Sequence, residues 1–152
     1  MFQVVESLVS SRLGHECIKD TDTCCRLYVL PWVTINSDME FRVFVHENAI
    51  TAVSQQHLLS VNETLAATSD GDLDRSIVQP ILRYFDESIR HHFVDIGSYT
   101  LDLAVLDDGS VYFIEPNVFG AEYAAGSALF HWIHDAEALH SCKDIELRIT
   151  DH

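Results

Sequence analysis

The sequence predicts an α+β fold, a mostly antiparallel sheet with covering helices. Two apolar segments, Glu40–Gln55 and Tyr99–Asn117, each contain a turn-forming dipeptide near the middle, which indicates two β-hairpins. A helical pattern runs between them from Asp72 to about His92, so strands and helices do not alternate as in parallel βαβ sheets. With 152 residues, 47% of them hydrophobic, the chain has material for one core, and we expect a single domain over residues 1–152.

The first 26 residues carry an ambiguous pattern. Phe2–Leu13 fits either a helix or a strand, and the polar segment His15–Thr23 indicates a loop. The short apolar segment Leu27–Val33 predicts a strand. We therefore expect the organised part of the domain to extend from residue 27 to about residue 150, after a poorly assigned segment 1–26.

The first hairpin is expected to turn at Glu47-Asn48. With a two-residue loop, residues equidistant from the turn face each other, which places Glu40, Arg42 and Gln55 on one face at the open end. Two roles for Arg42 remain open. It can form a salt bridge with Glu40 on the same face, or it can bind phosphate, because its guanidinium fork matches two phosphate oxygens.

The segment after the first hairpin predicts one long helix, with Asp72 as N-cap. Its apolar residues have the spacing of one helix face and are Ile77, Ile81, Phe85 and Ile89. Pro80 lies inside this pattern and is expected to bend the helix or to delay its start.

The second hairpin carries the residues that indicate chemistry. Its turn is expected at Asp108-Gly109, a dipeptide suited to a tight two-residue loop. Asp102 then lies opposite Glu115, with Cβ atoms about 4.5–5.5 Å apart, and Asn117 follows on the same face. Two carboxylates this close among apolar neighbours need a positive charge between them. Carboxylate and amide oxygens are ligands of Mg²⁺, so the pattern predicts a magnesium site carrying a nucleotide phosphate, with solvated strand ends as the alternative.

Two more elements are expected after this hairpin, a helix from about Ser127 to Leu139 and a closing strand at Asp144–Thr150. Both hairpins are apolar on both faces through their middles, so we expect the sheet to be covered on both sides.

The composition excludes several classes of partner. The formal net charge is −15 and the chain has two lysines, which argues against binding to DNA or to an anionic membrane and fits a basic partner. No apolar run approaches the roughly 18 residues of a membrane-spanning helix, and no signal-peptide pattern is present. The four cysteines lack the spacing of zinc or redox sites and suit a reducing compartment. We expect a cytoplasmic protein.

Five blocks follow one another along the chain: Met39–Val45, Ala52–Gln55, Leu101-Asp102 with Ile114–Gly120, Ser127–Trp132 and Glu146–Arg148. In this order they resemble the cell division cycle protein 123 family. That family is a branch of the ATP-grasp superfamily and serves as an assembly chaperone for translation initiation factor 2. The chain is more loosely similar to bacterial and viral ATP-grasp ligases.

The resemblance implies the carboxy-terminal lobe of an ATP-grasp fold over residues 27–150, with ATP and Mg²⁺ as cofactors. Asp102, Glu115 and Asn117 match the family's magnesium-binding positions. Arg42 matches an arginine that contacts nucleotide phosphate.

The resemblance also implies a hinge and a partner. The segment Leu27–Trp32 matches the hinge whose backbone holds adenine, which gives Val29, Leu30 and Trp32 as nucleotide-binding residues. The implied partner is the γ subunit of translation initiation factor 2.

The chain departs from the family pattern in three places. Gln56 stands where an arginine is usual, and Leu30-Pro31 stand where basic residues precede the tryptophan. The residues given before Leu27 show no counterpart of the family's amino-terminal lobe. Among them, Lys19 is the candidate for the phosphate-binding lysine of that lobe. The sequence therefore predicts a Mg/ATP-binding module that is truncated or weakened in nucleotide binding, with a further lobe in cis or in trans.

Two alternatives remain open beside this binding module. One is an enzyme, an ATP-dependent carboxylate–amine ligase of the bacterial and viral branch, which would need no side-chain nucleophile. The other is a degenerate relative kept for protein contact. We prefer the binding module, which is not an enzyme.

Overall fold

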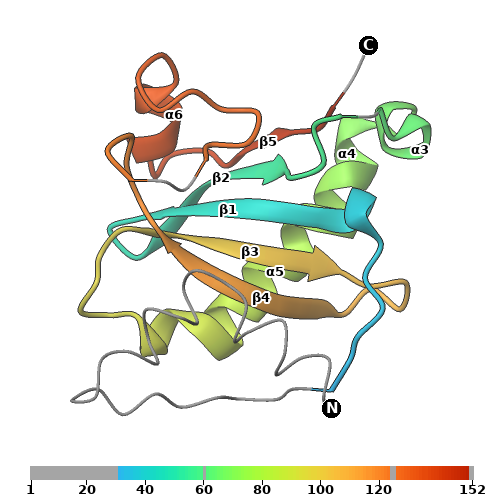
Figure 1. Cartoon of the computed structure of the whole chain (residues 1–152), viewed down its shortest axis with the longest axis horizontal. Helices are drawn as coiled ribbons and strands as arrows, with labels where there is room; N and C mark the ends of the chain where they lie inside the picture. The colour runs from blue at the N-terminus through green and yellow to red at the C-terminus, as the bar shows by residue number, and fades with distance from the viewer. Residues whose placement is uncertain (1–30, 60, 124–125, 151–152) are drawn as a thin grey trace, which may run out of the picture. The chain divides into compact units, whose positions relative to one another are not determined.

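The computed structural model describes residues 31–59, 61–123 and 126–150 (Figure 1). The chain divides into two compact units, residues 1–33 and 34–152. Most of the first unit, including most of the predicted strand Leu27–Val33, lies outside the described residues, and residues 31–33 form no strand. The prediction of a single domain over the whole chain therefore stays a prediction, and the following description concerns the second unit.

The second unit is an α+β fold built on a five-stranded sheet of order β4-β3-β1-β2-β5. The strands are β1 (Glu40–His46), β2 (Ala49–Gln55), β3 (Tyr99–Val105), β4 (Val111–Val118) and β5 (Glu146–Arg148). Neighbouring strands pair antiparallel except β5, which pairs with β2 in parallel at the edge of the sheet. The predicted, mostly antiparallel sheet is confirmed.

A long helical segment crosses one face of the sheet (Figure 1). It follows the short helix α3 (Glu63–Ala66) and consists of α4 (Asp70–Leu73), a π-helical turn (Asp74–Val78), α5 (Gln79–Tyr84), a second π-helical turn (Phe85–Ile89) and a 3₁₀ turn (Arg90–His92). Its N-cap is Ser69 rather than the predicted Asp72. Within the described ranges, no helix has the length and hydropathy needed to cross a membrane.

Pro80 lies inside this segment without ending it. Proline has no N–H group to donate to the preceding turn, which normally breaks an α-helix. Here the turn before it is widened, and Gln79 donates its backbone N–H to the carbonyl of Asp74, five residues back. The prediction that Pro80 delays the start of the helix is therefore wrong, because the helix begins at Asp70.

The sheet has an apolar core on each face. The predicted helix residues Ile77, Ile81, Phe85 and Ile89 are all buried, and they pack against Phe41, Val43, Leu101 and Leu103 of the sheet. On the other face a smaller cluster consists of Phe44, Ala52, Phe130 and Leu139. The expectation that the sheet is covered on both sides is confirmed for β1 and β2, which contribute to both clusters.

The first hairpin turns at Glu47-Asn48 as predicted, and both residues have positive φ angles. A β-bulge between Phe44 and Val45 then shifts the register, so Gln55 faces Phe41 instead of Glu40. The prediction that Gln55 shares a face with Glu40 and Arg42 is therefore wrong.

The second hairpin has a wider turn than predicted. Leu106 donates its backbone N–H to Ser110, and Gly109 takes the positive φ of 78° that the turn requires, so the loop has three residues. A bulge between Asp102 and Leu103 shifts the register back by one residue. The predicted two-residue loop is wrong, but the two shifts offset each other.

The carboxy-terminal segment has less regular structure than the sequence predicts. The predicted helix Ser127–Leu139 is reduced to α6 (Ala136–His140), and the predicted strand Asp144–Thr150 is reduced to β5. The Ser127 hydroxyl bonds the carbonyl of Phe130, and Asp135 accepts from the N–H of His131. Such side-chain bonds to the backbone compete with helix formation.

Candidate functional site

The structure brings the three predicted metal ligands together. Asp102 on β3 lies directly opposite Glu115 on β4. The Nδ2 atom of Asn117 donates to Asp102 Oδ2 over 3.1 Å and to Glu115 Oε1 over 3.3 Å. Asp102 is 4% exposed, whereas Glu115 is exposed. The cluster therefore reaches from the buried middle of the sheet to solvent.

Arg42 closes the buried end of this cluster. It lies opposite Asp102 because β1 and β3 are neighbours. Its Nε and Nη2 atoms donate to the two Asp102 oxygens over 2.8 and 2.7 Å, and both side chains are at most 10% exposed. Its Nη1 atom donates to the carbonyl of Gly126. The salt bridge of Arg42 is thus formed with Asp102 and not with Glu40, the partner that the hairpin pattern suggested.

The donor set fits a hard divalent cation. Glu115 and Asn117 supply a carboxylate and an amide group, and Mg²⁺ in proteins is commonly held by one or two carboxylates while it keeps several waters. Asp102 already accepts three hydrogen bonds from Arg42 and Asn117, and a carboxylate has about four acceptor sites, so it has room for one more contact. No cluster of three His, Cys, Asp or Glu side chains suited to a metal occurs in the part of the chain that the structure describes. The predicted set has two carboxylates, and its third ligand is the amide of Asn117.

One residue of this cluster, Asn117, also lines a cavity near the end of β4. The volume of this cavity is about 390 Å³. Its other lining residues are mainly apolar and aromatic and include Phe93, Tyr99, Phe119 and Tyr123. Arg42, Asp102 and Glu115 do not line this cavity, and Phe93 and Tyr99 belong to the core on the helix side of the sheet.

Glu40 is a further acid beside the cluster. Burial raises the pKa of Glu40, and the negative charge of Asp102 raises it further, while His57 opposes these effects. The hairpin pattern indicated Glu40 only as a partner of Arg42. Its position two residues before Arg42, on the same strand face, was the available signal.

Arg148 on β5 fixes the segment that approaches Arg42. It donates to both carboxylate oxygens of Asp135 over 2.9 and 2.8 Å, and to the carbonyl of Leu129. Its guanidinium lies 4.0 Å from the centre of the Phe130 ring. The hydrogen bonds from Arg148 hold the pKa of the Asp135 carboxyl down to about 2.

A buried serine adds to this anchoring. Ser54 lies opposite Arg42 on β2 and accepts the backbone N–H of Leu129 over 2.9 Å. Together with Arg148 it ties residues 127–135 to the sheet. Gly126 directly precedes this tied segment, and its carbonyl binds Arg42. No local sequence pattern indicates this support.

The predicted hinge residues are not tested by the structure. Val29 and Leu30 lie outside the described residues. Trp32 belongs to the first unit, and its side chain is 92% exposed. Their role in nucleotide binding stays a prediction.

Fold and site together define an α+β protein with a five-stranded mixed sheet, one long helix and an acid–arginine cluster on the sheet. The family comparison agrees with the resemblance seen in the sequence. Residues 8–152 match the D123 family, and the chain belongs to this family.

Two relatives carry the name translation initiation factor eIF2 assembly protein. The one from Dictyostelium discoideum is 31% identical over 101 residues, which is 64% of this chain and 25% of the relative. The one from Danio rerio is 30% identical over 106 residues, which is 70% of this chain and 28% of the relative. The match therefore spans about a quarter of the length of these curated relatives.

Solved structures of Cdc123 from Schizosaccharomyces pombe have the same fold. One is similar with a TM-score of 0.61 at 17% identity, covering 92% of this chain and 54% of the solved chain. A carboxy-terminally truncated form gives a TM-score of 0.56 at 16% identity, covering 91% of this chain and 57% of the solved chain. The chain thus has a Cdc123-like fold and corresponds to about half of the solved chains.

Proposed function

We propose that this chain is an Mg²⁺- and ATP-binding module of the ATP-grasp type, equivalent to the carboxy-terminal lobe, that acts in the assembly of translation initiation factor 2. The observation that carries the proposal is the convergence of Arg42, Asp102, Glu115 and Asn117 from three adjacent strands. The family membership supports it.

Glu115, Asn117 and the remaining acceptor site of Asp102 would hold the cation. Asn117 now directs its Nδ2 atom to both carboxylates, so its amide would turn to present oxygen instead. Bound Mg²⁺ would supply positive charge that neutralises the phosphate oxygens of the nucleotide.

Arg42 can contact phosphate while it stays paired with Asp102. A guanidinium has five N–H donors, and Arg42 uses three of them, two on Asp102 and one on Gly126. One N–H on each terminal nitrogen remains for a phosphate oxygen. The pair with Asp102 and the bond to Gly126 fix the orientation of the fork, so little side-chain entropy is lost when phosphate binds.

The partner in this proposal is translation initiation factor 2, through its γ subunit, in the cytoplasm. The names of the two relatives support the factor, and the net charge of −15 suits a basic protein surface. Such a chaperone role requires binding without turnover. Nucleotide and cation would order the site. If the partner binds the ordered form with higher affinity, its affinity for the chain would rise when nucleotide and cation are present.

Paramagnetic broadening by Mn²⁺ tests the cation site in the full chain. In ¹H–¹⁵N spectra with ATP present, Mn²⁺ should broaden the amides around Asp102, Glu115 and Asn117 first. Glu115→Gln should reduce the broadening, whereas Asp107→Asn, which removes an exposed carboxylate in the hairpin loop, should not. Broadening centred elsewhere would contradict the assignment, and steady release of phosphate with an added amine acceptor would indicate a ligase.

Binding to the purified γ subunit tests the partner. The chain and the γ subunit should co-elute on size exclusion, and ATP with Mg²⁺ should increase the complexed fraction. A γ subunit that elutes alone at micromolar concentrations of both proteins would contradict this part of the proposal.

A further inference from the structure

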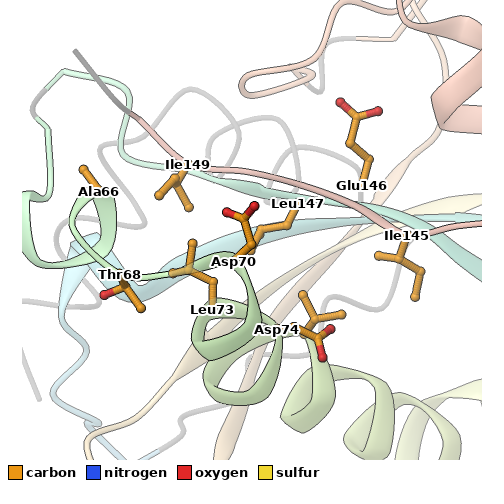
Figure 2. Close-up of a pocket in the computed structure, with 10 residues that line it drawn as sticks. Ala66, Thr68, Asp70, Leu73, Asp74, Ile145, Glu146, Leu147 and Ile149 are labelled. Atoms are coloured by element: carbon orange, nitrogen blue, oxygen red, sulfur yellow. The ribbon is translucent and has the colours of Figure 1, made fainter.

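A groove lies on the far side of the sheet from Arg42, between the long helical segment and β5. Its volume is about 500 Å³. Leu73 and Val78 line it from the helix, and Ile145, Leu147 and Ile149 line it from β5 and its flanks. Figure 2 shows these three side chains pointing toward the helix, whereas Glu146 points away from it. The floor of the groove is therefore apolar and continuous with the main core.

The rim of the groove is acidic. Asp70 and Asp74 line it from the helix, four residues apart, and therefore lie on the same helix face. Like charges at this spacing repel each other. Within the described ranges neither aspartate takes part in a salt bridge, whereas their neighbour Asp72 pairs with Arg75. A positive charge supplied from outside would relieve this repulsion.

None of the described residues that line the groove is basic. Its ten lining residues include three acids, Asp70, Asp74 and Glu146, and neither lysine nor arginine. Glu146 pairs with Arg148 at 2.7 Å, although Arg148 also pairs with Asp135. The side chain of Glu146 points away from the helix (Figure 2), which leaves the two aspartates as the charges that an occupant would meet first. Gln79 donates hydrogen bonds to the Asp74 carboxylate but brings no charge. An apolar floor with a rim of two aspartates fits apolar side chains flanked by cations, and the net charge of −15 would attract such an occupant over a longer distance.

Within the part of the chain that the structure describes, the groove also borders an unpaired sheet edge. β5 is the last strand of the described sheet and pairs on one side only, with β2. An extended segment lying along β5 could therefore place alternate side chains in the groove. The edge is short, three residues, so we expect the side chains to contribute more to binding than strand pairing does.

From this combination we propose that the groove between α4 and β5 docks a short extended segment of a partner protein, in which apolar residues alternate with lysine or arginine. The site is separate from the Arg42 cluster and does not depend on nucleotide. The groove is thus a second binding surface of the chain, for a segment of a different chemistry.

Peptide titration of the full chain tests the proposal. The probe is a fluorescein-labelled hexapeptide that alternates lysine and leucine, measured by fluorescence anisotropy. Two further peptides serve as controls, one alternating glutamate and leucine and one alternating lysine and serine. We expect weak binding of the lysine–leucine peptide, with amide shift changes at residues 66–78 and 145–149 in ¹H–¹⁵N spectra, and no binding of the controls.

Two variants test the rim and the floor. Asp70→Asn with Asp74→Asn should weaken binding by about 2- to 30-fold, the range for two solvent-accessible ion pairs. Asp95→Asn with Asp107→Asn removes the same charge from exposed positions outside the groove and should leave the affinity unchanged. Ala66→Phe should fill the groove and abolish binding while the aspartates are kept. All three variants should retain MgATP binding, which separates this proposal from the previous one.

Four results would overturn the proposal. They are equal binding of the glutamate–leucine peptide, equal weakening by the two charge-removing variants, shift changes outside the groove, and no response at millimolar peptide. Sedimentation tests a second copy of the chain as the occupant. Self-association of the chain that is lost in Ala66→Phe would show that a second copy fills the groove, and it would also overturn the proposal of a partner segment.

Discussion

Replacing Asp102 by asparagine removes the charge that balances a buried guanidinium. Arg42 is 8% exposed and Asp102 is 4% exposed, and two hydrogen bonds of 2.7–2.8 Å join them. An exposed salt bridge contributes only about 0–1 kcal/mol. Removing one partner of a buried pair costs about 3–5 kcal/mol, because the other charge stays buried without compensation. Asparagine keeps the shape of the side chain, so no cavity adds to this cost.

We therefore expect Asp102→Asn to lower the free energy of unfolding by about 3–5 kcal/mol. For a chain of this size that corresponds to a fall in Tm of roughly 6–20 °C. Urea unfolding followed by circular dichroism measures the change at neutral pH. The matched control Asp107→Asn, on the exposed hairpin loop, should change the free energy by no more than about 0.5 kcal/mol.

A double variant separates the charge from the packing. Arg42→Met combined with Asp102→Leu leaves no buried charge, so it should be more stable than Asp102→Asn alone. A cost of less than about 1 kcal/mol for Asp102→Asn, or a double variant no more stable than the single one, would show that the unpaired buried charge is not what destabilises the protein.

Three further predictions concern the fold around the site. Phe85→Ala should lower the free energy of unfolding by about 3–5 kcal/mol in urea, because the ring is fully buried between helix and sheet, and a loss below about 1 kcal/mol would contradict the packing. Gly109→Ala should cost about 1 kcal/mol, since alanine disfavours the φ of 78°, and an unchanged urea midpoint would contradict the turn. The Asp135 pKa is lowered from 3.8 to about 2, so its stabilisation is present above pH 3.8 and lost as the pH falls toward 2. Asp135→Asn should flatten the dependence of Tm on pH across this window, and an unchanged slope would contradict the bond to Arg148.

The second hairpin illustrates how far local sequence reasoning extends. The prediction that Asp102 faces Glu115 is confirmed, although it assumed a two-residue loop. The loop has three residues, and the bulge beside Asp102 offsets the change. Turn dipeptides do not reveal bulges, since a bulge depends on how the strand packs against its neighbours. The uncompensated bulge at Phe44 moved Gln55 to the other face of the first hairpin.

Contacts between distant segments were not predictable in the same way. The partner of Arg42 is Asp102, 60 residues away, and the pair forms because β1 lies next to β3. The sequence showed two hairpins but not how they adjoin. The anchoring of residues 127–135 by Ser54 and Arg148 likewise joins β2 and β5 to a loop, and it depends on tertiary contacts that no local pattern contains.

The periodicity of apolar residues predicted where the helical segments lie. Individual residues then changed the geometry or the length of those helices. The apolar spacing from Ile77 to Ile89 correctly identified the buried helix face. Pro80 was accommodated by a π-helical turn, which periodicity does not reveal. Near Asp135, side-chain bonds to the backbone replaced most of the predicted helix.

Calorimetric titration of the full chain with ATP measures whether the acid–arginine cluster binds a magnesium–nucleotide complex. We expect weak binding that requires Mg²⁺, is abolished by EDTA, is reduced in Glu115→Gln and is unchanged in Asp107→Asn. Absence of binding, binding that persists in EDTA or in Glu115→Gln, or tight binding with rapid hydrolysis would contradict this expectation.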